Sequence, residues 1–369
     1  MKLFIISFVF FISTFSIPVS STEISFSAVG DMIFGRAGNH FGLDDPFRFV
    51  TQYFKGKDIV FGNLETPITS KRYRMSRKPR ICKVSTRHCN PKDAKRYARL
   101  YRLTFYGRPK AAKLLKTAGF TLLGTANNHA EDQGSKGLLE TIKFLHKNGL
   151  SHVGSGATPK EAWKPYIFEK KGVKVGIIAA TELWNFPPMK RKGYYAFVDF
   201  PKIYKELPKR VAKLKKKTDF VVVALHFGEE YVHGAYGREK RLIKKLAAAG
   251  MDLFVGSHPH VLRGIQIIGK SVVFWSLGNF NFDNTRGPRG ESAIAQLDFV
   301  KDSNGKRMKN ITFYPVRLNL DPQKRSKVVT GKKAKSILKK VLRYSRTFRN
   351  KKCQLKIIND VIKIDPYCS

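Results

Sequence analysis

Apolar residues occur along the chain in short runs that alternate with stretches of helical periodicity. The runs are rich in β-branched and aromatic residues and are bounded by Gly, Asn or Asp, a composition that favours strands. The predicted strands are residues 23–29, 58–61, 121–124, 173–180, 219–225, 252–255 and 271–275.

Amphipathic stretches between these runs predict helices over residues 109–118, 135–148 and 239–249. The last two end before Gly149 and Gly250, and glycine directly after a helix is typical of a C-terminal cap. Alternating strands and helices predict an α/β domain whose helices cover the faces of the sheets.

Two segments do not follow this alternation. Residues 71–108 are basic, contain two cysteines and are interpreted as an insertion over one edge of the domain. Residues 324–352 hold thirteen Lys and Arg and no acid, with apolar positions at helical spacing. This basic amphipathic helix either docks on the domain or lies on an acidic partner. We therefore divide the chain into residues 1–21, a domain over 22–320 and a basic C-terminal extension over 321–369.

The first 21 residues have the pattern of a secretory signal peptide. One positive charge, Lys2, precedes an apolar stretch that runs to Ile17 and small residues that end at Ser21. We expect cleavage after Ser21 and a periplasmic or cell-surface protein, and an uncleaved membrane anchor is the alternative.

Four cysteines are consistent with export, since an even number permits two disulfides. Of three connectivities we favour the local pairs, Cys82 with Cys89 and Cys353 with Cys368. A structural zinc site is the alternative, but neither pair has the spacing that such sites usually show.

Charge narrows the choice of partners. The 369 residues include 70 Lys and Arg against 27 Asp and Glu, a formal net charge of +43. Hydrophobic residues make up 42%, too many for a disordered basic tail, and beyond the N-terminus no apolar run is long enough to span a membrane. Such a charge commonly indicates nucleic-acid binding. Export argues against that partner, because nucleic acid is a less common ligand outside the cytoplasm. An acidic polymer or an anionic envelope surface is then the expected partner.

Polar residues cluster where the predicted strands end. These clusters are residues 30–36, 62–65, 126–134, 226–231, 256–260 and 276–280. In open α/β sheets ligands bind beyond the carboxyl ends of strands, so we expect the clusters to meet. Their Asp, Glu, Asn and His side chains suit Zn, Mn or Fe, as one or two divalent ions.

These clusters resemble the motifs of CapA-type poly-γ-glutamate capsule synthesis proteins, which belong with the calcineurin-like metallophosphoesterases. The motifs are Gly-Asp-x-x-x-Gly-Arg, Asn-Leu-Glu-x-Pro, Ala-Asn-Asn-His-x-x-Asp-x-Gly, His-x-Gly-x-Glu-Tyr, Gly-x-His-Pro-His-Val and Ser-Leu-Gly-Asn-Phe. The resemblance runs from Ser27 to about Asp283. It implies an αββα fold of four layers, in which two packed β-sheets are flanked by helices.

The resemblance also implies roles for individual residues. The metal ligands would be Asp31, Glu65, Asn128, His226, His258 and His260. His129 would be the general acid, with Asp132 beside it in the motif, and Arg36 would hold an anionic carboxylate or phosphate.

The sequence departs from metallophosphoesterases in two of these motifs. Asp31-Met32-Ile33 supplies no histidine where Asp-x-His is usual, and Asn63-Leu64-Glu65 replaces a Gly-Asp block with its bridging aspartate. Glu230 is a candidate for the missing ligand. CapA-type proteins share these departures, which favours that family over a phosphatase.

Three functions follow. The leading hypothesis is an exported protein of poly-γ-glutamate synthesis, export or attachment, working with other capsule proteins as a metal-dependent hydrolase or transferase. The alternatives are a metal-dependent phosphoesterase or nuclease, and a non-enzymatic protein that binds polyanions or the cell envelope. The motifs leave open whether the protein catalyses or only binds.

Overall fold

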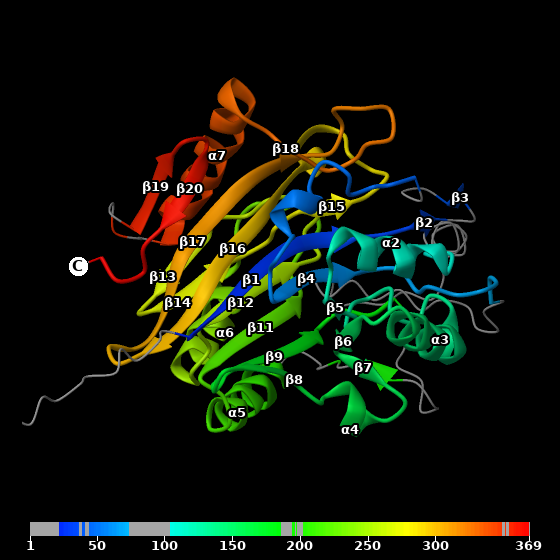
Figure 1. The fold of residues 1–369 in the computed structure, drawn as a ribbon, viewed down its shortest axis with the longest axis horizontal. Coiled ribbons are helices and arrows are strands. Elements are labelled where there is room, and N and C mark those ends of the chain that lie inside the picture. The colour runs from blue at the N-terminus through cyan, green and yellow to red at the C-terminus, as the bar shows by residue number, and fades with distance from the viewer. Residues whose placement is uncertain are drawn as a thin grey trace, which may run out of the picture.

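Two β-sheets face each other, and helices cover their outer surfaces (Figure 1). This computed structural model describes residues 22–36, 39–40, 44–73, 104–185, 194–195, 197, 202–348, 351 and 354–368. Four layers of the type αββα result, as the family resemblance implied.

The larger sheet has the strand order β19-β20-β17-β16-β1-β4-β5-β6, with β15 beside β1 and β18 beside β17. Neighbours among β1, β4, β5 and β6 are parallel, whereas β16, β17 and β20 pair antiparallel. The bounds are β1 (Thr22–Met32), β4 (Ile59–Leu64), β5 (Leu122–Gly124), β6 (Ser151–Val153), β15 (Asn279–Asn281), β16 (Glu291–Asp302), β17 (Gly305–Arg317), β18 (Lys327–Val328), β19 (Leu355–Ile358) and β20 (Val361–Ile364).

The smaller sheet has the order β13-β14-β12-β11-β9-β8. Its four central strands are parallel, so their carboxyl ends lie at one edge. The bounds are β8 (Tyr166–Lys170), β9 (Val173–Thr181), β11 (Phe220–His226), β12 (Leu253–Ser257), β13 (Ile265–Ile268) and β14 (Ser271–Phe274). Two short pairs join β2 (Gly35–Arg36) to β3 (Asn39–His40) and β7 (Ser155–Gly156) to β10 (Tyr194–Tyr195).

Helices pack on both outer faces through their apolar sides. The large sheet is covered by α2 (Lys110–Ala118) and α3 (Gly134–Lys147), and the small sheet by α5 (Ile203–Lys215) and α6 (Gly237–Ala248). The remaining helices are α4 (Pro159–Ala162), α7 (Gly331–Ser345) and the 3₁₀ turns η1 (Thr51–Tyr53), η2 (Gly287–Gly290) and η3 (Arg346–Phe348). Every strand and helix predicted within residues 22–320 forms, with bounds shifted by a few residues at most, whereas the basic helix expected within 324–352 is shorter and spans Gly331–Ser345.

The basic C-terminal helix docks on the domain. Ile337, Leu338 and Val341 of α7 are buried in the core between the two sheets, and β20 extends the large sheet by pairing with β17. Lysines on the other side of the helix, such as Lys335 and Lys339, are exposed. Of the two interpretations of this segment, the structure supports docking, and the basic side chains face solvent.

Several predictions fall on residues outside the described part of the chain. They are the signal segment 1–21, most of the insertion including Cys82 and Cys89, and Cys353. Cys368 is described and is disulfide-bonded, while the pairings themselves stay predictions. Among the described residues, no helix is both long and apolar enough to cross a membrane.

Candidate metal centre

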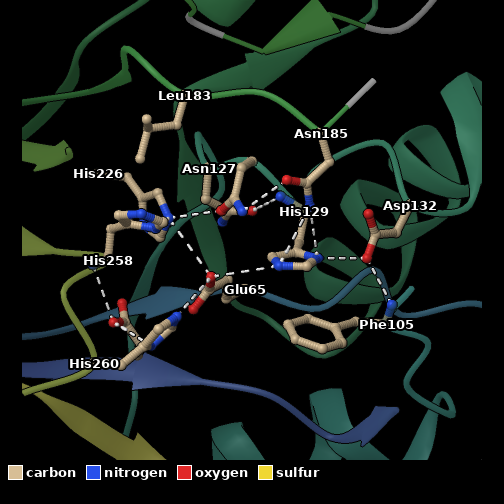
Figure 2. Close-up of polar contacts among 12 residues, drawn as sticks. Glu65, Phe105, Asn127, His129, Asp132, Leu183, Asn185, His226, His258 and His260 are labelled. Carbon is tan, nitrogen blue, oxygen red and sulfur yellow. Dashed lines mark hydrogen bonds and ion pairs between the residues drawn. The ribbon is translucent and has the colours of Figure 1, made fainter. Parts of the chain in front are cut away.

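The predicted ligands come together where strands of both sheets end. Asp31 in β1 lies in register with Asn63 in β4 and Asn279 in β15, and His226 in β11 lies in register with Ser257 in β12. Because the two sheets face each other, carboxylates from the large sheet meet imidazoles from the small one (Figure 2).

Glu65 lies at the centre of this group. Its Oε1 is 3.5 Å from Nε2 of His226, 3.8 Å from Nε2 of His260 and 3.9 Å from Nε2 of His129. Both carboxylate oxygens are buried, and neither has a hydrogen-bond partner among the described residues. Burial raises the pKa of the Glu65 carboxyl well above its usual value, although His260 opposes the shift. A buried carboxylate without partners is costly unless a cation compensates it.

Two imidazoles of the small sheet are held in their neutral form. Nε2 of His226 is 3.1 Å from Nδ1 of His258 and 2.8 Å from Oδ1 of Asn128. Burial, together with the neighbouring imidazoles, lowers the pKa of both His226 and His258 well below the usual value. On its other side, Nδ1 of His226 contacts Oγ of Ser257 at 3.1 Å. A neutral imidazole with one nitrogen fixed by a partner is suited to bind metal through the other.

Asp31 and His260 form the opposite side of the centre. Asp31 accepts hydrogen bonds from Nδ2 of Asn63 at 2.8 Å and from the backbone N–H of His258 at 3.1 Å. Its Oδ2 is 3.4 Å from Nδ1 of His260, and that nitrogen also contacts Oδ1 of Asn279 at 2.9 Å. Burial lowers the pKa of His260, but the Glu65 and Asp31 carboxylates outweigh burial and raise it to about 9.

The His258-Pro259-His260 loop has an uncommon backbone conformation. The φ angles of His258 and His260 are 95° and 57°, in the left-handed region that non-glycine residues rarely adopt. Such conformations cost on the order of 1–3 kcal/mol each and persist where surrounding contacts enforce them. Here Asp31 holds the backbone of His258, and the carbonyl of Pro259 accepts a hydrogen bond from Tyr231.

The residues present fit one or two transition-metal ions. Three sets of residues could each hold an ion, because within each set the ligand atoms lie within 4.8 Å of one another. The sets are Glu65 with His226 and His258, Asp31 with Glu65 and His260, and Glu230 with His258 and His260. Mixed oxygen and imidazole donors suit Zn, Mn or Fe. Asn128 reaches the same centre through His226. Glu230, the candidate for a missing oxygen ligand, belongs to the third set.

His129 lies beside this centre and is held on three sides. Its Nδ1 is 2.6 Å from Oδ2 of Asp132, and its ring stacks on Phe105 with centroids 3.8 Å apart. Asn185 approaches the same ring at 3.3 Å. Asp132 is buried, which raises its pKa, whereas His129 opposes the shift. The remaining nitrogen, Nε2, therefore faces Glu65 in a fixed orientation.

Arg36 is held at the margin of the site, beyond Phe105. Its Nε forms an ion pair with Oδ2 of Asp283 at 2.8 Å, and its guanidinium carbon lies 4.8 Å from the Phe105 ring centroid and 5.7 Å from that of Phe282. These contacts hold the guanidinium close to His129 and His260, whose rings pack on the same two phenylalanines.

Sequence reasoning missed several residues that orient the site. Asn63 and Asn279 stand inside recognised motifs, so their motif positions were a signal for the contacts to Asp31 and His260. Phe105 lies at the end of the segment interpreted as an insertion, and its contact with His129 had no local signal. No sequence pattern indicated the contacts of Asn185 and Asp283 either.

The fold and the site define an αββα protein with histidine and carboxylate side chains at its strand ends. Residues 25–284 match the family model described as bacterial capsule synthesis protein PGA_cap. The chain therefore belongs to this family of capsule synthesis proteins.

Two relatives are similar over most of this chain. It is 31% identical to the PGA biosynthesis protein CapA of Bacillus subtilis over 78% of this chain and 70% of the relative. It is also 31% identical to the capsule biosynthesis protein CapA of Bacillus anthracis, over 76% of this chain and 65% of the relative. A solved 5'-nucleotidase from Candida albicans aligns with 88% of this chain and 58% of its own, at 12% identity. The TM-score of this alignment is 0.45.

Proposed function

We propose that this capsule synthesis protein is an exported, metal-dependent hydrolase or transferase that acts on the γ-linked amides of poly-γ-glutamate or a similar acidic polymer. Family membership supports a role in capsule synthesis. The observation that carries the proposal is the buried Glu65 carboxylate, which has no hydrogen-bond partner among the described residues and is surrounded by imidazoles.

The chain divides the chemistry among its residues. Glu65, Asp31 and Asn128 would hold the metal with His226, His258 and His260, which are the six predicted ligands. A bound divalent metal would supply Lewis-acid polarisation of the substrate carbonyl and an activated water. The protein's own contribution is to hold neutral imidazoles and a carboxylate at fixed positions in a buried site.

His129 is positioned to give a proton to the leaving amine. Asp132 holds Nδ1, and Phe105 fixes the plane of the ring, so that Nε2 points toward the centre. The 2.6 Å contact between Asp132 and Nδ1 fixes the ring so that Nε2 is the nitrogen from which a proton can pass to the leaving group. A positioned acid of this kind contributes roughly 10²–10⁴-fold to a rate.

Arg36 supplies the recognition of anions. Its guanidinium can form paired hydrogen bonds with a carboxylate, and Asp283 together with two phenylalanines fixes its position. Each residue of a γ-linked glutamate chain carries one free α-carboxylate, so such a polymer always presents a group for Arg36.

The test compares polymer shortening by wild-type protein and by His129→Ala after metal loading. We expect the wild type to shorten poly-γ-glutamate and His129→Ala to be at least about 10²-fold slower. His146→Ala is the matched control, because His146 is an exposed histidine on α3 that contacts His152 outside the site. This control should keep full activity and metal content.

Two results would favour the alternatives. Hydrolysis of a generic phosphate diester with no effect on poly-γ-glutamate would indicate a phosphoesterase. A metal-loaded protein that binds the polymer without changing its length would indicate a binding protein. Export is tested separately by the intact mass of the secreted chain, which should begin at Thr22.

A further inference from the structure

A row of arginine and aromatic side chains borders the metal centre on the side of His260. The His260 ring lies 4.8 Å from the Phe282 ring and 6.2 Å from the Tyr231 ring, between centroids. Beyond Phe282 lies Arg36, at 5.7 Å, and beyond Tyr231 lies Arg289, whose guanidinium carbon is 5.3 Å from the tyrosine ring centroid. The row therefore runs from one arginine to the other, with His260 in the middle.

Arg289 is joined to the metal centre through its backbone. It lies in η2, and its carbonyl accepts a hydrogen bond from Nδ2 of Asn279 at 3.1 Å. The other end of the same amide, Oδ1 of Asn279, contacts Nδ1 of His260 at 2.9 Å. The place of Arg289 relative to His260 is thus fixed without use of its side chain.

Tyr231 connects the Arg289 side chain to the loop of the candidate ligands. Its backbone N–H donates to the carbonyl of Pro259 at 2.8 Å, and its φ angle of 66° lies in the left-handed region. The side chain is nevertheless 48% exposed, so the strained backbone presents an aromatic ring to solvent beside the site. The same ring lies 5.3 Å from the guanidinium carbon of Arg289 and so links that side chain to the loop.

Neither of these two arginines is fully paired with an acidic side chain, and both pack on aromatic rings. Arg36 forms an ion pair with Asp283, with Nε 2.8 Å from Oδ2, and Arg289 forms no ion pair with another described residue. Both are partly shielded from solvent and supported by aromatic rings, a setting that strengthens hydrogen bonds from guanidinium to carboxylate.

We propose that Arg289 and Arg36 bind carboxylates of neighbouring residues of one acidic polymer strand, so that Arg289 is a specificity-determining residue that makes the site accept polycarboxylates. The inference rests on the proposed function, which supplies the polymer. The two guanidinium groups are held beside His260 by different aromatic rings, Phe282 and Tyr231, so they offer separate binding points to a ligand that carries several carboxylates. A ligand with a single carboxylate engages only one of them.

The experiment measures binding to poly-γ-glutamate of defined length and to its neutral methyl ester, with metal-loaded protein. All proteins carry His129→Ala so that the polymer stays intact. Arg289→Gln should raise the dissociation constant for the acid polymer about tenfold, the effect of one lost charge-assisted hydrogen-bonded pair. Its affinity for the ester should not change. Arg289→Lys keeps the charge but loses the planar fork, and we expect about threefold weaker binding.

Arg286→Gln is the matched control. Arg286 lies three residues before Arg289, is exposed, and precedes the same turn. It should bind both polymers within twofold of the parent protein. Metal content should be equal in all variants, because the contact from Asn279 uses the backbone of Arg289.

The outcomes separate this inference from the proposed function. Equal losses of polymer affinity in Arg289→Gln and Arg286→Gln would mean that the polymer is attracted by the overall positive charge, and would overturn the inference. Unchanged polymer affinity in Arg289→Gln, or loss of its metal, would overturn the inference as well. If the protein with His129 intact still shortens the polymer, the proposed function survives that result. Selective loss in Arg289→Gln without shortening by the wild type would support the inference and contradict the hydrolase. A wild type that binds no polymer overturns both.

Discussion

The strand-end site and the C-terminal segment use charge in opposite ways. At the site Asp31 and Glu65 are 0% exposed, and the carboxylate of Glu65 has no hydrogen-bond partner among the described residues. In α7 most lysines face solvent, although Lys340 pairs with Glu291, while Leu338 and its apolar neighbours are buried between the sheets. Both segments are polar in sequence, but only the site keeps its charges away from water.

The buried apolar side of α7 stabilises the fold, whereas the buried charges of the site are retained for function. Burial of the apolar side of α7 stabilises the folded chain, at roughly 1.5–3 kcal/mol for each large side chain. Burial of an unpartnered carboxylate does the reverse unless a cation is bound. The net charge of +43 therefore does not describe the site, where buried carboxylates lie beside the neutral imidazoles of His226 and His258.

His258→Ala should produce the largest effect and test the site directly. The change removes an imidazole shared by two of the three candidate ligand sets. Changes to residues that merely support a metal ligand cost about 10–100-fold in affinity, so loss of a ligand should cost at least about 100-fold. Metal content measured after gel filtration should fall to near zero, and activity should fall with it.

Metal binding is coupled to folding, so the same variant should also melt earlier than the metal-loaded wild type. At a metal concentration about 100 times the dissociation constant, binding adds about 2.7 kcal/mol of stability. Chelation of the wild type should lower its melting temperature toward that of the variant. His146→Ala should match the wild type throughout. A His258→Ala protein that keeps its metal and its melting temperature would remove His258 from the ligand set.

Leu338→Ala should have the second largest effect and tests the other side of the comparison. Leu338 is 0% exposed in the core that both sheets share. Truncation of a buried leucine costs about 2–5 kcal/mol, so chemical denaturation should show a loss of stability in this range. Metal bound per folded molecule should stay at the wild-type level.

Lys339→Ala provides the control for that measurement, since the neighbouring side chain is exposed on the same helix. Its stability should lie within about 0.5 kcal/mol of the wild type. If Leu338→Ala left the unfolding of the whole domain unchanged, α7 would be an appended helix that unfolds independently.

The fold was predictable where the chain signals its structure locally. Strands such as β9 and β11 consist mostly of apolar residues, and α6 ends just before Gly250. The long antiparallel pair β16 and β17 was not predicted, because buried polar residues interrupt the apolar pattern of β16. Gln296 is one of these, and its partner Ser27 is distant in sequence.

The same distinction applies to the site. Its six candidate ligands stand within motifs, in strands or just after them, so the family resemblance could name them from the sequence. The residues that hold them in place were harder to predict. Phe105 and Asp283 contact His129 and Arg36 only after the chain has folded, and neither has a sequence pattern of its own.

Tyr344→Ala should have the smallest effect, and it tests whether the two regions are separate at all. Tyr344 lies in α7, and its ring stacks on His233 with centroids 4.4 Å apart and an angle of 14° between the planes. His233 belongs to the loop of Glu230 and Tyr231 and is fixed by a 2.8 Å contact with the carbonyl of Leu262. The C-terminal segment, which lies beyond the family match at 25–284, therefore supports the loop beside the metal centre.

Loss of this stacking should cost about 0.5–1.5 kcal/mol, which corresponds to a weakening of roughly twofold to tenfold in whatever the loop position controls. We expect this change in metal affinity, measured by competition with a chelator, while Tyr344→Phe keeps the stacked ring and should match the wild type. Equal metal affinity in Tyr344→Ala, Tyr344→Phe and wild type would show that α7 contributes stability only. A selective loss in Tyr344→Ala would mean that the basic segment, although remote from the motifs, helps to set the geometry of the site.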